Sequence, residues 1–208
     1  MACLQTLSGI AHDCAPSMGG IVEVYLANFA DVTGLTFTDG VITTITMADD
    51  GGTPPISATF KKYSFPRNTG SLSSNYTIDK TTGANFVVSD LVMVFSKMET
   101  GKRVEVTALA QGELVAIVRD ANRKLWYLGK DEPLVASAGD GLTGTARADR
   151  NGYSITEKRD LCENEWCNSG MPIDFGSALY ALEEPDKVIT EGNLEVYSND
   201  DETNSAVL

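Results

Sequence analysis

The chain has 208 residues, of which 42% are hydrophobic, and its 29 acidic and 16 basic residues give a formal net charge of −13 at pH 7. This length allows one domain with a substantial core, or one domain with appendages. The charge argues against tight binding to a phosphate backbone, and no unbroken apolar run is long enough to cross a bilayer. Four cysteines are too few for a disulfide scaffold. Because residues 1–20 lack the basic leader and apolar stretch of a secretory signal, we expect a protein that stays in a cytoplasm.

Strands are predicted along most of the first half of the chain. Residues 21–28 alternate between apolar and polar side chains, and residues 32–48 predict a hairpin with Asp39-Gly40 at its turn. The two acids, two glycines and two prolines of residues 49–55 predict a solvated loop. Residues 58–79 predict two strands about a Pro-Arg-Asn-Thr-Gly turn.

A long strand and then a helix are predicted next. The strand covers residues 84–98. The helix spans about residues 99–112. Thr100 is a suitable N-cap, the Ala-Leu-Ala-Gln run favours helix, and Gly112 is placed to end it. The alternation of small apolar residues also permits a single strand over residues 104–118, broken at Gly112.

The segment 115–134, VAIVRDANRKLWYLGKDEPL, predicts a hairpin, because two apolar runs flank the turn-forming Asp120 and Asn122. Such an apolar hairpin is not stable alone in water. We interpret it as a sheet element covered by the core and by a neighbouring subunit. The alternative is an internal sheet hairpin of a monomer.

The last part of the chain is less regular. Many glycines and threonines follow Leu134, and a turn at Asn151-Gly152 leads into a strand predicted for Tyr153 to Glu157. A short helix is predicted at residues 176–187, and the acidic residues 198–208 predict a mobile end. No segment repeats at a fixed period, which argues against a solenoid or propeller.

No catalytic, cofactor-binding or metal-binding residue is predicted, and we do not expect an enzyme. His12 is the only histidine, and no nucleophile motif accompanies it, so a hydrolytic triad of the usual kind has no base. The stretch 139–144, GDGLTG, lacks the Gly-Lys-Ser/Thr of a phosphate loop. The cysteines lack the two-residue spacing of common zinc sites; they are Cys3, Cys14, Cys162 and Cys167. The adjacent acids are interpreted as solvated charges; they are Asp49-Asp50, Glu183-Glu184 and Asp200-Asp201.

Three segments carry a family resemblance: the opening ACLQTLSGIAHDCAPSMGGI, the Glu-Thr-Gly-Lys-Arg stretch at 99–103, and Trp126-Tyr127-Leu128-Gly129-Lys130-Asp131. Over residues 1–156 the chain resembles the major tail, or tail tube, proteins of tailed phages and prophages of Bacteroides-type gut bacteria. The resemblance implies a mainly β fold, a β-sandwich or barrel-like structure with one flanking helix. It also implies six-membered rings that stack into a conduit for DNA. The protein would then reside in the virion tail after assembly in the host cytoplasm, without cofactors.

The resemblance ends near residue 156, which sets the expected domain division. Residues 1–157 are assigned to a tail-tube-like β domain with an N-terminal arm at residues 1–20. Residues 158–208 are assigned to a C-terminal extension that packs partly on the outside of the tube, so a chain ending at Asp160 is expected still to assemble. The arm and the loop at 49–55 are expected to become ordered against a neighbouring ring.

The same resemblance gives two expectations about the tube. The long strand at 84–98 would serve as a sheet edge that joins one subunit to the next. An acidic lining would repel the DNA that passes through, since duplex DNA carries one negative charge per roughly 1.7 Å.

Other classes of protein stay open at this point. Another phage structural protein, such as a head decoration, neck ring or tail terminator protein, would share the β content and acidity but would not polymerise. A carbohydrate-binding β module would expose Trp126, Tyr127 and Trp166 as sugar platforms. A hydrolase would need clustered acids that the sequence spacing does not reveal.

Overall fold

The computed structural model describes residues 10, 16–38, 41–48, 58–66, 69–78, 81, 85–161 and 180–182. Several predicted features lie outside the described residues. They are the arm before residue 16 apart from Ile10, the Asp39-Gly40 turn, the loop at 49–55, His12, the four cysteines, Trp166, the three acid pairs and the acidic end.

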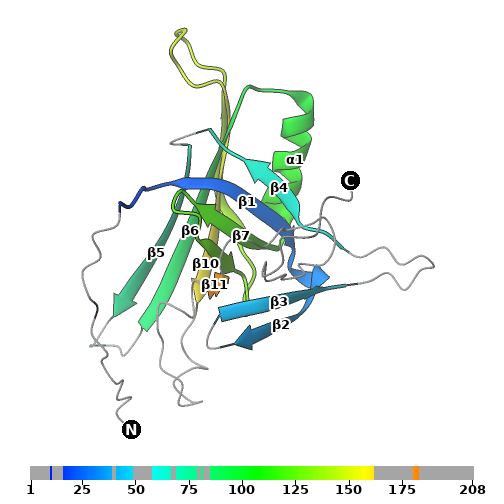
Figure 1. Ribbon diagram of the computed structural model, residues 1–208. Coiled ribbons are helices and arrows are strands. Elements are labelled where there is room, and N and C mark those ends of the chain that lie inside the picture. The colour runs from blue at the N-terminus through cyan, green and yellow to red at the C-terminus, as the bar shows by residue number, and fades with distance from the viewer. Residues whose placement is uncertain are drawn as a thin grey trace, which may run out of the picture.

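The described chain has a mainly β fold with one α-helix, α1 (Thr100–Gln111), as the sequence predicts (Figure 1). The strands form two sheets. The seven-stranded sheet has the order β2 (Val32–Thr38), β3 (Val41–Met47), β11 (Tyr180–Leu182), β8 (Leu125–Leu128), β7 (Leu114–Asp120), β1 (Ile21–Asn28) and β4 (Lys61–Ser64). The four-stranded sheet has the order β5 (Gly70–Ile78), β6 (Asn85–Ser96), β10 (Gly152–Leu161) and β9 (Val135–Leu142). A short 3-10 turn, η1 (Phe29–Asp31), links β1 to β2.

Strand β7 lies at the centre of the molecule because both of its faces are apolar. On one face, Ala116 and Val118 join a core between the two sheets, which also contains apolar side chains of β1, β6, β10 and α1. On the other face, Val115 and Ile117 join a second core with side chains of β3 and Phe60. All four side chains of β7 are fully buried in a single chain. The predicted hairpin is therefore an internal element, and the expectation that a neighbouring subunit helps to cover this strand is corrected.

Helix α1 packs against β9 and β10 at one end of the molecule. Glu99 is its N-cap residue, one position before the predicted Thr100, and Gly112 is its C-cap as predicted. The helix is only weakly attached, because Leu109 is its one buried side chain while Val104 is 60% exposed. A hydrogen bond from the Tyr63 hydroxyl to Glu105 ties it to β4.

Some of the predicted elements differ from the structure in their strand partners, in their position in a sheet or in their type. The strands predicted within 58–79 do form, as β4 and β5, but they belong to different sheets and do not pair. The strand predicted at 84–98 forms as β6, but it lies between β5 and β10 and is not an edge. Residues 180–182, within the predicted helix at 176–187, form the strand β11.

The predicted domain boundary after Glu157 falls inside a strand. Strand β10 continues to Leu161, and its register with β6 is unbroken through the pairs Lys158–Asp90 and Arg159–Ser89. Arg159 is 1% exposed, so it belongs to the interior of the molecule. Together with β11, which lies between β3 and β8, this places part of the assigned extension within the β body.

Candidate functional site

The aromatic residues that a carbohydrate module would expose are built into the fold. The Trp126 side chain is half-buried, and its indole Nε1 donates to Asp120 Oδ2 at 3.3 Å. Tyr127 is fully buried on β8. Tyr127 is therefore unable to stack on a sugar ring from solvent, Trp126 stays partly exposed, and the third predicted platform, Trp166, lies outside the described residues.

Groups that could support metal or phosphate chemistry are not brought together in the part of the chain that the structure describes. No three His, Cys, Asp or Glu side chains among these residues gather as metal ligands. Residues 139–142 of the glycine-rich stretch 139–144 belong to strand β9 and precede a turn, not a helix. This stretch is therefore part of a sheet edge and cannot present a phosphate loop at a helix N-terminus.

Among the described residues, the four-stranded sheet ends in two edge strands, β5 and β9, that run in opposite directions. Each neighbouring pair in the order β5, β6, β10, β9 is antiparallel. Because three successive reversals separate the outer strands, β5 and β9 point opposite ways. If a second copy is rotated about an axis roughly parallel to the strands and placed beside the first, its β5 would lie antiparallel to β9 of the first chain. The antiparallel sheet would then continue from one chain to the next.

Strand β9 is made almost entirely of small residues and is exposed along its length. Its sequence is VASAGDGL, and only Ala136 is partly buried. Between this strand and α1 lies an open groove of about 520 Å³, which we call the helix–edge groove. Its helical wall carries Arg103, Val106, Thr107, Ala110 and Gln111. The groove exists because Ala136 and Gly139 leave the space beneath the helix unfilled.

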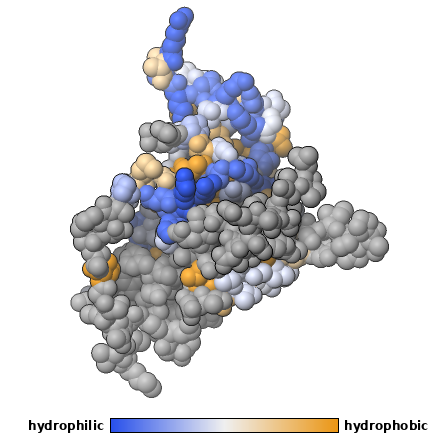
Figure 2. All heavy atoms as spheres, in the orientation of Figure 1, coloured by the Kyte–Doolittle hydropathy of each residue, from blue (hydrophilic) through white to orange (hydrophobic). Residues whose placement is uncertain are grey.

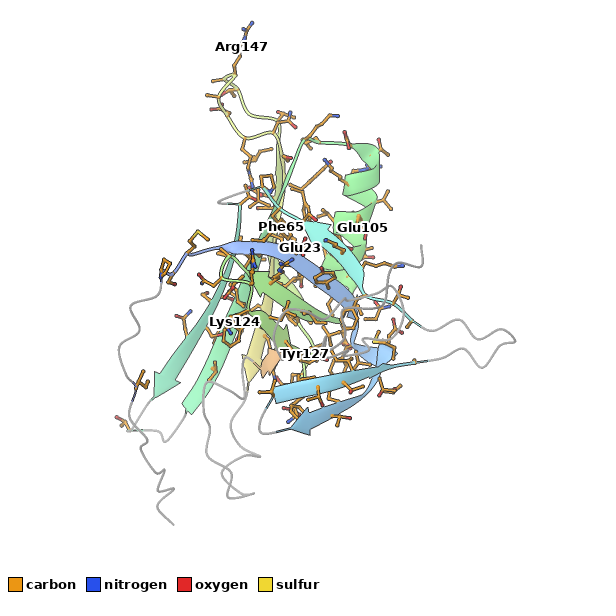
Figure 3. All side chains as sticks on the ribbon, in the orientation of Figure 1. Glu23, Phe65, Glu105, Lys124, Tyr127 and Arg147 are labelled. Atoms are coloured by element: carbon orange, nitrogen blue, oxygen red, sulfur yellow. The ribbon has the colours of Figure 1, made fainter. Side chains whose placement is uncertain are left out.

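The hairpin of β9 and β10 projects away from the body, with Arg147 at its tip (Figures 1 and 3). Asp149 holds the tip in shape, since its Oδ2 accepts from the amides of Thr145 and Ala146 at 2.8 and 2.7 Å. These backbone hydrogen bonds hold the pKa of Asp149 below its usual value. Figure 2 shows the tip as mainly hydrophilic.

Below the tip, Arg150 and Asp140 form an ion pair in which one guanidinium nitrogen contacts both carboxylate oxygens. The guanidinium Nη2 lies 2.8 Å from Oδ1 and 2.7 Å from Oδ2 of the carboxylate. Hydrogen bonds from Ser154 and from Arg150 lower the pKa of Asp140. This pair joins the two strands where the hairpin leaves the sheet.

The outer face of the four-stranded sheet, the one turned away from the seven-stranded sheet, combines hydroxyl, amide, aliphatic and charged side chains. Alternation along the strands sets its members, since Val87, Ser89, Leu91 and Met93 point inward and are buried. Among residues whose side chains are described, the outer face includes Ser71, Ser73, Asn75, Val88, Asp90, Val92, Val94, Val135, Ala138, Asp140, Ser154, Thr156 and Lys158, and Asp160 takes the register position opposite Val88 on the same face.

A charged network on the opposite side of the molecule is structural. Glu23 of β1 contacts Lys62 of β4 at 2.6 Å and Arg119 of β7 at 3.1 Å, and accepts from the Tyr25 hydroxyl at 3.0 Å. Burial raises the pKa of Glu23, but the hydrogen bonds from Lys62, Arg119 and Tyr25 outweigh this effect and lower it. The network connects three strands.

Glu157 is a charged residue that is buried without a hydrogen-bond partner for its carboxylate among the described residues. Its side chain is 0% exposed, and its carboxylate oxygens have no hydrogen-bond partner among the described residues. Burial raises its pKa to about 7. A carboxyl group with this pKa is about half protonated near neutral pH.

Comparisons with known proteins give no family for the chain: no family model, curated protein or solved structure matches it. None of the described helical residues forms a segment long and apolar enough to span a bilayer. The features of the described chain that bear on function are therefore the sheet edges, the helix–edge groove and the outer face of the four-stranded sheet.

Proposed function

We propose that the protein is a structural component of a phage tail. Six copies would form a ring, and these rings would stack into a tail tube that conducts DNA. The proposal joins the segment resemblance to tail tube proteins with the mainly β fold and its one flanking helix. The observation that carries it is the pair of edge strands, β5 and β9, that run in opposite directions at the two sides of one antiparallel sheet.

Such edges favour closed head-to-tail assembly. A heterologous interface joins two different surfaces, and it closes into a ring when the rotation between neighbours is a simple fraction of a turn. With β5 of each chain added to β9 of the next, six copies would supply about twenty-four strands. At roughly 4.8 Å between strands, the barrel would be about 37 Å wide between backbones, which leaves room for a DNA duplex.

The packing of the two sheets determines which face of the four-stranded sheet would line the inside of the barrel. The seven-stranded sheet and α1 pack on the inner face of the four-stranded sheet. Six copies of these layers do not fit within a barrel of this width, so they would surround it. The outer face of the four-stranded sheet would then line the channel, and the helix–edge groove would lie where one chain meets the next.

Electron microscopy and light scattering of the purified chain test the proposal. The wild-type protein is expected to form rings or tubes as its concentration rises. Gly139→Glu is expected to stay monomeric and folded, because an inward-pointing charge on an edge strand opposes strand addition. Gly139→Ala is the matched control, since a Cβ there would meet only Ser154 O, at 3.4 Å, and it should assemble normally.

Mixed cysteine variants test the proposed neighbours directly. Ala138→Cys on β9 is combined with single cysteine variants on β5, at Ser71, Ser73 and Asn75. With the four native cysteines replaced by serine in every variant, crosslinks between different chains are expected only in mixtures of the two kinds. A wild-type protein that stays monomeric at high concentration overturns the proposal. Rings that never stack indicate a different virion protein, such as a neck ring or tail terminator.

A further inference from the structure

We infer that the helix–edge groove is the socket for Leu72 of the next chain, and that this contact fixes the register in which β5 adds to β9. The inference rests on the proposed function, since it takes two copies of this chain as neighbours through these strands. It names the occupant of the groove, and it gives a reason for the glycine at position 139.

The groove is open on the inward side of β9 at Gly139. This residue lies opposite Ile155, which is buried in the core between the sheets, so position 139 also faces inward. An added Cβ at Gly139 would meet only Ser154 O, at 3.4 Å. At Gly141, the next inward position, a Cβ would lie 3.1 Å from the Tyr153 ring. Of these two glycines, Gly139 is therefore the one with free space beside it.

Strand β5 presents Leu72 on the same side of the sheet. Leu72 lies opposite Leu91, which is fully buried, so its side chain also faces inward. It packs on the core between the sheets but is only partly buried within its own chain. The inward positions on either side of it hold the small residues Gly70 and Ser74. Leu72 is thus the bulky inward side chain among those of β5 that the structure describes.

The alternation of side chains leaves few registers for the contact. In a continuous sheet an inward residue lies beside an inward residue of the next strand, because a shift by one residue turns every side chain to the other face. Leu72 of the next chain can therefore lie opposite Gly139 or Gly141, but not opposite the residue between them. The free space at Gly139 selects the first register. That register sets Ser73 opposite Ala138.

The charges at the two edges are complementary, which favours a second copy of the chain as the occupant. Arg103 is exposed and lines the groove, while Asp120 lines a hollow of about 270 Å³ that also contains Leu72. The first turn of α1 lies near the end of β9, since the Lys97 amide donates to Asn151 O at the base of the β9–β10 hairpin, at 2.6 Å. Antiparallel addition brings the start of β5 to this end of β9. The opposite charges would then lie at the same contact.

The first experiment measures the protein concentration at which rings or tubes form, by light scattering and electron microscopy. Gly139→Leu fills the groove from its own chain, and it is expected to raise this concentration by about tenfold or more. Adding Leu72→Ala to that variant restores the room, so the double variant should assemble near the wild-type concentration. Gly101→Leu is the matched control and should assemble normally, because a Cβ there meets nothing within 4 Å. Melting temperatures measured below the assembly concentration report whether each variant is folded.

The second experiment determines the register independently, with single cysteine variants in chains whose native cysteines are replaced by serine. Ala138→Cys is expected to crosslink mainly with Ser73→Cys and much less with Asn75→Cys. Normal assembly of Gly139→Leu, absence of rescue in a folded double variant, or a crosslink preference for Asn75→Cys overturns the inference while wild-type rings still support the proposed function. Failure of the wild type to form rings or tubes overturns the proposed function itself.

Discussion

Asn122 and Met18 exchange two hydrogen bonds across the molecule: the Met18 amide donates to Asn122 Oδ1 at 2.8 Å, and Asn122 Nδ2 donates to the Met18 carbonyl at 2.9 Å. A third bond runs from the Ala121 amide to the Gly20 carbonyl at 3.0 Å. The turn between β7 and β8 therefore clasps the chain where it enters β1. Asp120 shapes this turn, because its Oδ1 accepts from the amides of Asn122 and Lys124.

Removal of this clasp is expected to free the entry to β1 while leaving the fold intact. Asn122→Ala should cost about 1 kcal/mol, the usual value for exposed hydrogen bonds of this kind. Hydrogen exchange at the amides of Met18 and Ala121 should accelerate. Asn122→Asp keeps the acceptor for Met18 and loses the donor, so an intermediate rate is expected. Unchanged exchange in Asn122→Ala would show that the clasp does not restrain the arm.

The stability of the protein should fall as the pH rises through neutrality because of Glu157. Its pKa is about 7 in the folded chain, above the ordinary value of 4.5, so the folded state binds a proton that the unfolded state has lost. The stabilising effect is complete below pH 4.5 and is lost as the pH rises through about 7. The full difference corresponds to roughly 3 kcal/mol.

Urea denaturation of the wild type and of Glu157→Gln between pH 4.5 and 8 measures this effect. The variant cannot ionise, so its stability should change less across the window, and it should exceed the wild type at pH 8. Parallel profiles for the two proteins would assign the pH dependence to other groups.

Gly152 is expected to tolerate no side chain, because it combines a strained backbone with a close approach. Its φ is +156°, and an added Cβ would lie 2.0 Å from the Phe95 carbonyl oxygen. Gly152→Ala should therefore destabilise the chain by at least about 2 kcal/mol. Gly139→Ala, on the partner strand of the same hairpin, is the control and should cost well under half as much. Similar melting temperatures for the two variants would contradict this packing.

A chain that ends after Leu161 should be much less stable than one that ends after Leu182. Strand β11 lies between β3 and β8, where Leu182 pairs with both Ile42 and Leu125. Its loss would leave backbone groups of both neighbours unpaired and uncover Ile42, which is 0% exposed, at a cost of roughly 3 kcal/mol or more. Thermal unfolding of the two truncated chains checks this. Equal melting temperatures would show that strand β11 is dispensable for the stability of the β body.

The sequence by itself determined the elements whose signal is local. The alternation of residues 21–28, the hairpin patterns at 32–48 and 115–134, and the cap at Gly112 all correspond to observed strands, hairpins and the end of α1. Composition also determined the mainly β class, because β-branched and aromatic residues recur at strand spacing along the chain.

Only the tertiary structure decided how those elements are paired. Strand β9 has no β-branched residue after Val135, so its propensity is weak, and it forms because β10 offers it a hydrogen-bonded partner. The placement of β6 in the middle of a sheet, of β11 between β3 and β8, and of Lys158 opposite Asp90 all depend on contacts between residues far apart in the chain. Periodicity reports which face of a strand is apolar, but it carries no information on the strand beside it. The edge strands β5 and β9, on which the proposed function depends, therefore became visible only in the folded chain.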